Sequence, residues 1–328
     1  MSRSSRDIGA HLVDPETSRQ GDGAAPRTAP DTIDPREPVG SVDARSPWRM
    51  SFRRFRKHKM AMVSLVVLIM VVLLAFVGGA VWHYKYNVYS NDLSFKPSFK
   101  HPFGTDSTGY DTFAEVLRGT QRSLEIATFV SVSSTIVGTI YGAISGYAGG
   151  VVDSIMMRIV DLFLTFPIIA IAAVLTHNIG PKANGWFWIS VVLASLTWPY
   201  VGRVVRGNAL AIREKEYIEA AHALGATRTR VVFRHVVPNV ISVVIVIFTI
   251  LVATSILAET ALSFVGFGVA APDTSLGLLV YSAQTAVATR PWLFYFPGLF
   301  IILIALTANF IGDGLRDALD PTASKGRA

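Results

Sequence analysis

The stretch Met60–Tyr84 reads MAMVSLVVLIMVVLLAFVGGAVWHY and contains no Asp, Glu, Lys or Arg. The apolar layer of a bilayer is about 30 Å thick, and a helix needs about 20 apolar residues to cross it. A helix that is apolar on every side belongs in a membrane or in the centre of a large protein. This stretch therefore predicts a helix that spans a membrane, and it sets the fold class for the rest of the chain.

Five further uncharged runs of similar length follow it. They are Ile126–Val152, Leu162–Pro181, Ala183–Gly202, His235–Ala258 and Pro291–Gly312. We expect an all-α integral membrane protein with six transmembrane helices. The stretch Thr260–Thr289 is also apolar, but Pro272, Asp273 and several glycines interrupt it. It is predicted to be an ordered loop or a half-inserted segment packed on the bundle.

The composition supports this fold class. Hydrophobic residues make up 51% of the 328 residues, charged residues only 16%, and the mean hydropathy is +0.43. Globular proteins are about 25% charged, so this chain has too few charges to cover a large soluble domain. It has no cysteine, which excludes disulfide bonds, thiolate metal sites and cysteine nucleophiles.

The positive charges predict the orientation. The net charge is +7, and alternate loops divide the 30 Lys and Arg residues into 23 on one side and 7 on the other. Cytoplasmic loops carry the excess of Lys and Arg, so both termini are predicted to be cytoplasmic. The positive charge is then explained by topology, and we expect no nucleic-acid partner.

The first 59 residues divide into two parts. Residues 1–46 contain six Arg and eight Asp or Glu but few large apolar residues, which predicts a disordered cytoplasmic tail. Residues 47–59 read PWRMSFRRFRKHK and place Trp48, Phe52 and Phe55 on one helical face among basic residues. We expect an amphipathic helix on the inner membrane surface, with an unstructured flank as the alternative. Residues 60–320 would form the six-helix domain, with outer loops at 84–125 and 259–290 and a cytoplasmic loop at 203–235.

Two groups of residues, one inside a predicted span and one at the entry to another, indicate contacts within the bundle. Glycines recur at every fourth position near the end of the second span, at Gly138, Gly142, Gly146 and Gly150. Missing side chains on one helix face allow another helix to approach closely, either as static packing or as a gating contact. Near the start of the third span, Arg158 and Asp161 have the spacing of a helical ion pair.

The most informative loop is Arg213–Asn239, which reads REKEYIEAAHALGATRTRVVFRHVVPN. Tyr217, Ile218, Ala221 and Leu224 follow helical spacing, and Gly225 is placed to end the helix. A second short basic helix, Thr227–His235, would lead to Pro238 at the start of the fifth span. We therefore predict a helix–glycine–helix unit on the cytoplasmic face, where a partner protein could reach it.

The order Glu219-Ala220-Ala221, Gly225, Pro238 resembles the EAA motif of bacterial ABC importer permeases, although His235 and Val237 stand where that pattern has Ile and Leu. Three more segments resemble the C-type permease of the dipeptide and oligopeptide systems. They are HPFGTDSTGYDTFAEVLRGTQRS at His101–Ser123, AETALSFVGFGVAAPDTSLG at Ala258–Gly277 and NFIGDGLRDALDP at Asn309–Pro321. In the first of them Tyr110 stands where Arg is frequent. The resemblance extends from about Trp48 to Pro321.

The resemblance implies a type I ABC importer permease fold in the bacterial plasma membrane, and the subunit of an ATP-driven importer of di- or oligopeptides that forms half of the translocation pathway. It also implies which residues couple this subunit to a cytoplasmic ATPase. These are Tyr217, Glu219, Ala220, Ala221, Leu224 and Gly225.

The implied partners are a homologous second permease, two ATP-binding subunits or one two-domain ATPase, an extracellular substrate-binding lipoprotein, the peptide and membrane lipid. The chain itself contains no G-x-x-x-x-G-K-[ST] phosphate loop, no H-E-x-x-H pair and no convincing Ser–His–Asp arrangement. We therefore expect no enzyme activity, metal or cofactor in this chain, with ATP and magnesium bound by the partner ATPases.

Three alternatives compete with this interpretation. The same family also handles nickel chelates, glutathione and haem, so the resemblance leaves these substrates open beside peptides. An intramembrane enzyme would need facing catalytic residues deep in the spans, and none is evident in the sequence. A self-sufficient secondary transporter or channel would need internal repeats or buried charges along an ion path, and it leaves the loop motif unexplained.

Overall fold

The computed structural model describes residues 47–179 and 185–319, which belong to one compact unit, Ser46–Ala328. The predicted disordered tail, residues 1–46, lies outside the described residues. Apart from one bridge between Thr105 and Asp111, the described residues form helices, turns and loops.

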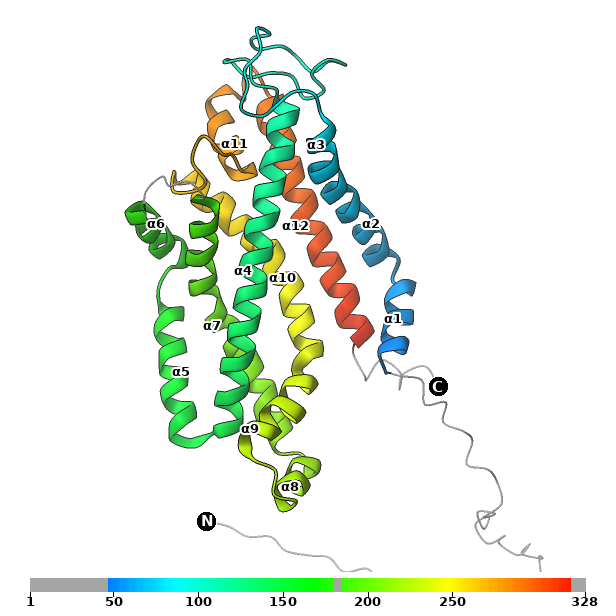
Figure 1. Cartoon of the computed structure of the whole chain (residues 1–328), viewed down its shortest axis with the longest axis vertical. Coiled ribbons are helices and arrows are strands. Elements are labelled where there is room, and N and C mark those ends of the chain that lie inside the picture. The colour runs from blue at the N-terminus through cyan, green and yellow to red at the C-terminus, as the bar shows by residue number, and fades with distance from the viewer. Residues whose placement is uncertain (1–46, 180–184, 320–328) are drawn as a thin grey trace, which may run out of the picture. The chain divides into compact units, whose positions relative to one another are not determined.

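Figure 1 shows the helices as a bundle. The α-helices in chain order are α1 (Pro47–Lys57), α2 (Lys59–Leu73), α3 (Gly79–Val81), α4 (Thr112–Ala148), α5 (Gly150–Thr165), α6 (Ile168–Ile179), α7 (Gly185–Arg213), α8 (Glu216–Ala223), α9 (Arg228–Val231), α10 (Val237–Phe264), α11 (Leu276–Ala283) and α12 (Trp292–Leu319). Short π-helical segments join α2 to α3 and α9 to α10.

Five helical stretches in the described residues are long and apolar enough to cross a membrane, and a bent pair of helices makes a sixth candidate. The continuous stretches are Lys59–Val81, Thr112–Ala148, Gly185–Arg213, Arg228–Phe264 and Trp292–Leu319. The bent pair is Gly150–Thr165 with Ile168–His177. The all-α membrane fold expected from the sequence is confirmed.

The third span differs from its prediction as one helix over Leu162–Pro181. The chain bends by 80° between α5 and α6, and Phe166 is extended, with φ −83° and ψ 142°. Pro167 explains the break, because proline has no amide hydrogen and disfavours helical conformation in the residue before it. The last predicted residues of this span lie outside the described residues.

The second span begins earlier than its prediction. Helix α4 starts at Thr112 rather than Ile126, because the Asp111 side chain accepts a hydrogen bond from the Ala114 amide at 3.0 Å and caps the helix. The predicted outer loop over residues 84–125 is therefore a loop only as far as Asp111. Within the predicted loop 259–290, α10 continues to Phe264, and α11 packs against α4, α10 and α12.

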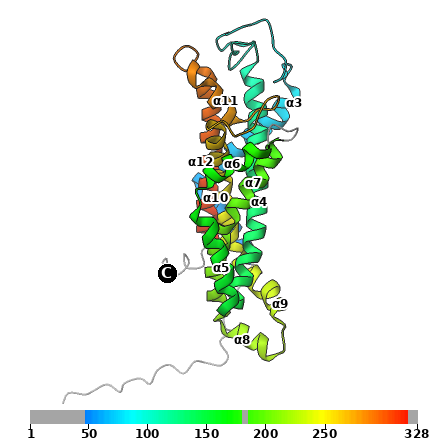
Figure 2. The same cartoon turned by 90° about the vertical axis from the view of Figure 1, so that its left-hand side faces the viewer.

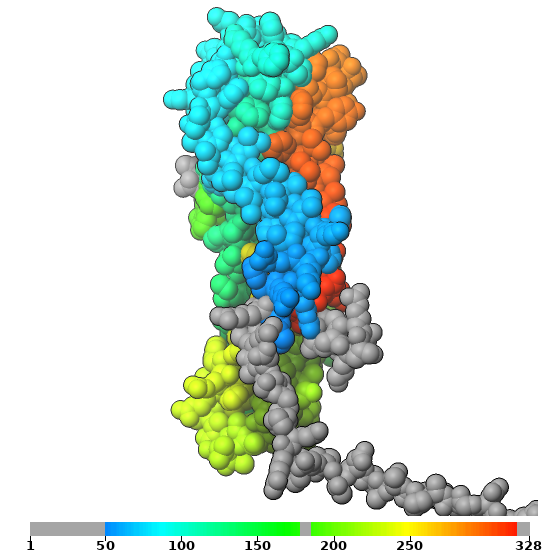
Figure 3. Space-filling view, turned by 90° about the vertical axis from the view of Figure 1, so that its right-hand side faces the viewer, coloured from blue at the N-terminus to red at the C-terminus, as the bar shows by residue number. Residues whose placement is uncertain are grey.

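Helices α4 and α7 pack along each other, and α10 and α12 complete the centre of the bundle. Helix α2 lies on the outside of α12, as Figure 3 shows. Helix α1 forms where an amphipathic helix was predicted, but its aromatic side chains do not share one environment. Phe55 is buried and packs against α12, whereas Phe52 is 63% exposed.

Candidate functional site

The predicted coupling residues lie at one end of the bundle, which we call the α8 end (Figure 1). Helix α8 ends in a tight turn, in which the amides of Leu224, Gly225 and Ala226 donate to the carbonyls of Ala220, His222 and Ala221 at 3.1, 2.8 and 3.0 Å. Gly225 has a φ of +81°, a left-handed conformation that glycine adopts without a steric penalty. The glycine of the motif therefore reverses the chain after α8.

One side of α8 is fixed to the bundle. The Ile218 side chain is 1% exposed and belongs to a core cluster with residues of α4, α7 and α10. The His222 Nε2 lies 2.6 Å from the Tyr147 hydroxyl oxygen of α4, and the two rings are nearly parallel. Sequence reasoning missed the Tyr147–His222 contact, because nothing in the local pattern relates residues that are 75 positions apart.

The other side of α8 faces away from the bundle. Tyr217, Glu219 and Ala220 are exposed, and Leu224 is 89% exposed. The predicted apolar face is therefore divided, because Ile218 is buried while Tyr217 and Leu224 are exposed, and Ala221 is half-buried. The Tyr217 ring also lies 6.3 Å from the ring of His235. An exposed leucine and tyrosine beside a carboxylate form a surface that can contact another protein.

Helix α8 is joined to two membrane-spanning helices by short turns. Helix α7 continues without interruption to Arg213, and the helical stretch that begins at Arg228 continues to Phe264. The predicted separate helix Thr227–His235 is therefore wrong as an independent element, since Pro238 lies in the first turn of α10 without a break. A force on α8 would act on the ends of both spanning helices.

Three of the four predicted packing glycines lie against the backbone of α7. A Cβ atom at Gly138 would lie 2.7 Å from the Trp198 carbonyl oxygen, and one at Gly146 would lie 2.6 Å from the Arg206 carbonyl oxygen. Gly142 lies between these two positions, against Gly202. Gly150 does not share the contact, because the chain turns at Gly149 with a φ of +64° and Gly150 begins α5, with nothing near its Cβ position.

Two ion pairs join α5 to α7. The carboxylate of Asp153 accepts two hydrogen bonds from Arg206, both at 2.5 Å, and one from the Ser145 hydroxyl. Asp161 pairs with Arg203. The predicted pair of Arg158 with Asp161 is therefore wrong, because the arginine of the neighbouring helix takes that place.

The opposite end of the bundle, which we call the α11 end, contains a fully buried carboxylate. Glu259 of α10 accepts hydrogen bonds from the hydroxyls of Ser263 and Ser275 at 2.7 Å and of Ser123 at 3.1 Å. The Ser123 hydroxyl in turn accepts from the Leu276 amide at 3.2 Å. This network binds the first turn of α11 to α4 and α10. Glu259, Ser263 and Ser275 belong to Ala258–Gly277, one of the segments that resemble the permease family.

Charged groups also fix the loops at the α11 end. Asp273, just before α11, pairs with Arg118 at 2.9 Å and Arg122 at 2.5 Å, both on α4. In the loop before α4, the buried His101 ring lies 2.8 Å from one carboxylate oxygen of Asp111. The other oxygen of Asp111 accepts a hydrogen bond from the Trp82 ring nitrogen at 2.8 Å. The two loops at the α11 end are therefore both bound to α4.

A partly exposed ion pair stabilises the same loop. The Lys100 ammonium lies 2.5 Å from Asp92, and the His101 Nε2 lies 3.2 Å from the same oxygen. These hydrogen bonds, that of Lys100 first, hold the pKa of Asp92 below its ordinary value, and the pKa of Lys100 is raised by the same contact.

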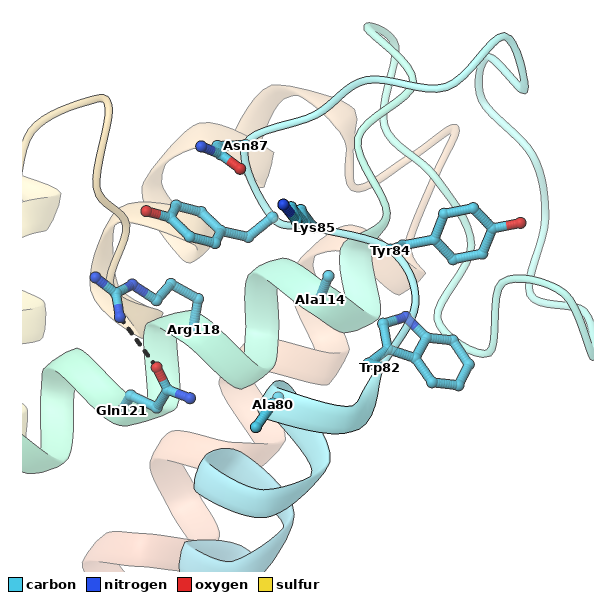
Figure 4. Close-up of a pocket in the computed structure, with 10 residues that line it drawn as sticks. Ala80, Trp82, Tyr84, Lys85, Asn87, Ala114, Arg118 and Gln121 are labelled. Atoms are coloured by element: carbon cyan, nitrogen blue, oxygen red, sulfur yellow. Dashed lines mark hydrogen bonds between the residues drawn. The ribbon is translucent and has the colours of Figure 1, made fainter.

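A cavity of about 270 Å³ lies between the end of α3 and α4 at the α11 end (Figure 4). Trp82, Tyr84 and Lys85 line it from the loop, and Arg118 and Gln121 line it from α4, joined to each other by a hydrogen bond. Arg118 also lies over the Tyr86 ring, 5.1 Å from its centre.

Within residues 47–179 and 185–319, no group of three His, Asp or Glu side chains is arranged to hold a metal ion.

Comparisons with known proteins identify the same family that the sequence motifs resemble. Residues 138–325 match the family described as binding-protein-dependent transport system inner membrane component, and residues 46–102 match the N-terminal TM domain of oligopeptide transport permease C. The chain is similar to the "Oligopeptide transport system permease protein OppC" of Mycobacterium tuberculosis, with 41% identity over 272 residues, which cover 83% of this chain and 93% of the relative.

Two further relatives cover similar lengths. The protein of the same name from Bacillus subtilis is 37% identical over 281 residues, which cover 85% of this chain and 91% of the relative. The "Dipeptide transport system permease protein DppC" of Alkalihalophilus pseudofirmus is 36% identical over 300 residues, which cover 91% of this chain and 97% of the relative.

Proposed function

The chain belongs to the family of binding-protein-dependent transport system inner membrane components, and from this premise we propose that it is the permease subunit of an ATP-driven importer of di- and oligopeptides. It is a multi-pass inner-membrane protein that forms part of a transport pore and is not itself an enzyme. The names of the relatives support peptides as the substrate, because they describe oligopeptide and dipeptide transport.

The two-sided packing of α8 carries the proposal. Ile218 and His222 hold one side of the helix to the bundle. Exposed residues lie on α8 and the turn after it: Tyr217, Glu219, Ala220 and Leu224. In this proposal α8 docks in a groove of a cytoplasmic ATPase, where Glu219 pairs with a basic residue and the small Ala220 permits close approach. Closure of the ATPases then moves α7 and α10 through the ends that flank α8.

The proposal includes the rest of the assembly. A homologous second permease completes the pathway, two ATP-binding subunits or one two-domain ATPase supply ATP hydrolysis with magnesium, and a substrate-binding lipoprotein delivers peptide at the α11 end. The fixed loops at that end support this last assignment, because a surface held by Glu259 and Asp273 presents a constant shape to a docking protein.

A charge reversal on α8 tests the coupling role. Glu219→Lys should reduce peptide uptake to background in vesicles that contain the whole importer, while the subunit inserts at the normal level and peptide no longer stimulates ATP hydrolysis. Glu214→Lys is the matched control, because Glu214 is also exposed but precedes α8. Normal uptake by the Glu219→Lys importer would disprove docking through this face.

A substrate test separates peptides from the other candidates. Vesicles with the intact importer and its binding protein are given radiolabelled tripeptide, nickel chelate, glutathione or haem in separate assays. We expect ATP-dependent uptake of the peptide. Uptake of one of the other compounds without peptide uptake would replace the proposed substrate and leave the family assignment intact.

A further inference from the structure

Helix α5 carries a line of polar residues on its exposed side. Ser154, Arg158, Asp161 and Thr165 follow one another at intervals of four, three and four residues, and all four are exposed. This spacing places them on one face of the helix. Helices α5 and α6 lie along the left edge of Figure 1 and on the side that faces the viewer in Figure 2.

The exposed surface of the first spanning stretch, which begins with α2 and ends at Val81, is different. Between Met60 and Val81 every exposed residue is apolar, and the hydroxyl-bearing Ser64 is 5% exposed. This is the pattern of a helix that faces lipid tails. Helix α5 has the opposite arrangement, because its ionic and hydroxyl-bearing residues, apart from Asp153, lie on the outside.

The charged residues on α5 are the decisive ones. The hydroxyls of Ser154 and Thr165 donate to carbonyls of their own helix, at 3.0 and 2.7 Å, so lipid could tolerate them. Asp161 and its partner Arg203 have side chains that are 51% and 53% exposed. Charged groups in contact with hydrocarbon are costly, and within membrane proteins they face the bundle interior or water.

The pair lies well inside the helical segment that is the candidate third crossing. Counting α5 and α6 as the third crossing, Asp161 is the twelfth residue of the crossing and lies about 17 Å from its first residue at 1.5 Å per residue. Apart from Arg158 and Thr165, the exposed residues around it, Ile159, Leu162 and Phe166, are apolar. A line of exposed polar residues thus interrupts an otherwise apolar surface.

The break between α5 and α6 is a second observation that this side of α5 meets water. Directly after Thr165, Phe166 is extended and 48% exposed, and Pro167 is also exposed. The end of α5 leaves backbone carbonyl groups without intrahelical partners. At membrane depth such backbone is tolerated only where protein covers it or where it lines a water-filled cavity.

We propose that this face of α5, with Arg203 of α7, lines a water-filled part of the transport path, and that the Asp161–Arg203 pair selects among peptides by charge. The inference rests on the proposed function and specifies where the substrate meets this subunit. A passing peptide contacts Asp161 with its cationic groups and Arg203 with its anionic groups.

The absence of cysteine from the chain permits a direct test. Single-cysteine variants Ser154→Cys and Thr165→Cys are compared with Val63→Cys and Val66→Cys on the exposed face of α2, all in the complete importer in lipid nanodiscs. A charged methanethiosulfonate that cannot cross membranes is added without nucleotide and with trapped ATP, and labelling of this chain is measured by its mass.

We expect the α5 cysteines to be labelled at least about tenfold faster than the α2 cysteines in one of the two states. The thiolate is the reacting form, and each unit by which an apolar environment raises the thiol pKa lowers its rate about tenfold. Equally slow labelling at α5 and α2 in both states would overturn the inference, because lipid or the second permease would then cover α5.

A second measurement tests the selection by charge. In Asp161→Asn the Arg203 guanidinium loses its partner, and the uptake ratio of acidic to basic tripeptides should rise by about tenfold. Val66→Asn on α2 is the control and should leave the ratio unchanged. An unchanged ratio in Asp161→Asn would remove the pair from the path. Peptide uptake by the unmodified importer tests the proposed function separately, so import of peptide with unreactive α5 cysteines rejects only this inference.

Discussion

The two ends of the bundle are fixed by different forces. At the α11 end, buried and partly buried charges make several hydrogen bonds each, with Glu259 bonded to three serines and Asp273 to two arginines. At the α8 end, the buried Ile218, the Tyr147–His222 contact and a ring contact between Tyr217 and His235 hold α8, and most of its residues are exposed. The difference indicates that the surface at the α11 end keeps a constant shape, whereas α8 can move relative to the bundle.

The largest effect is expected from Glu259→Ala. Removal of a buried carboxylate leaves the hydroxyls of Ser123, Ser263 and Ser275 without their shared acceptor, which should cost about 3–5 kcal/mol of stability. The amount of folded subunit and its melting temperature in detergent measure the loss. Glu125→Ala is the control, since Glu125 is 30% exposed and bonds to Arg122 alone. Equal stability of the two variants would contradict the rigid α11 end.

Ile218→Ala should come next and act on the α8 end. Truncation of a buried isoleucine costs about 2–4 kcal/mol, but here the loss should release α8 rather than unfold the bundle. We expect faster hydrogen exchange over Glu216–Ala223 and impaired coupling of ATP hydrolysis to uptake. Leu224→Ala, at a position that is 89% exposed, should weaken ATPase binding without faster exchange. Faster exchange across α4 or α10 would show that α8 is not a separate unit.

Tyr147→Phe should have a smaller effect at the same end. It removes one hydrogen bond, to His222, and should lower the stability of α8 by about 1 kcal/mol. Exchange over α8 should rise about fivefold, since 1.4 kcal/mol corresponds to a factor of ten. Tyr141→Phe is the control, because its hydroxyl bonds to the Met156 carbonyl of α5 instead. A similar rise in both variants would argue against a specific anchor.

The smallest effect concerns acid at the α11 end. The pKa of Asp92 lies below its ordinary value of 3.8, because Lys100 and His101 bond to its carboxylate. Its contribution to loop stability is therefore complete above that ordinary value and is lost as the pH falls through the lowered pKa. Limited proteolysis of the loop 82–111 should be unchanged from pH 8 to 5 and increase only below about pH 4. In Asp92→Asn this increase should be smaller, because only the bonds to the Asp111 carboxylate remain to be lost in acid.

The sequence predicted the fold class and the helix that carries the coupling motif. Uncharged runs of about 20 residues leave few structural alternatives, and the glycine at position 225 marked the end of α8 correctly. The sequence indicates that Pro167, Pro199 and Pro297 each permit a kink. It does not show that only Pro167 breaks its span, with a bend of 80°, because Pro199 and Pro297 are accommodated within continuous helices.

The sequence by itself determined that this chain crosses a membrane, how its charges divide between the loops, and which family it resembles, because these properties depend on local composition and spacing. Only the tertiary structure decided that Asp161 pairs with Arg203 rather than Arg158, that Tyr147 holds His222, and that Glu259 gathers three serines. Except for Ser263, which lies on α10 with Glu259, those partners come from different parts of the chain, and the packing of the helices brings them within hydrogen-bonding distance.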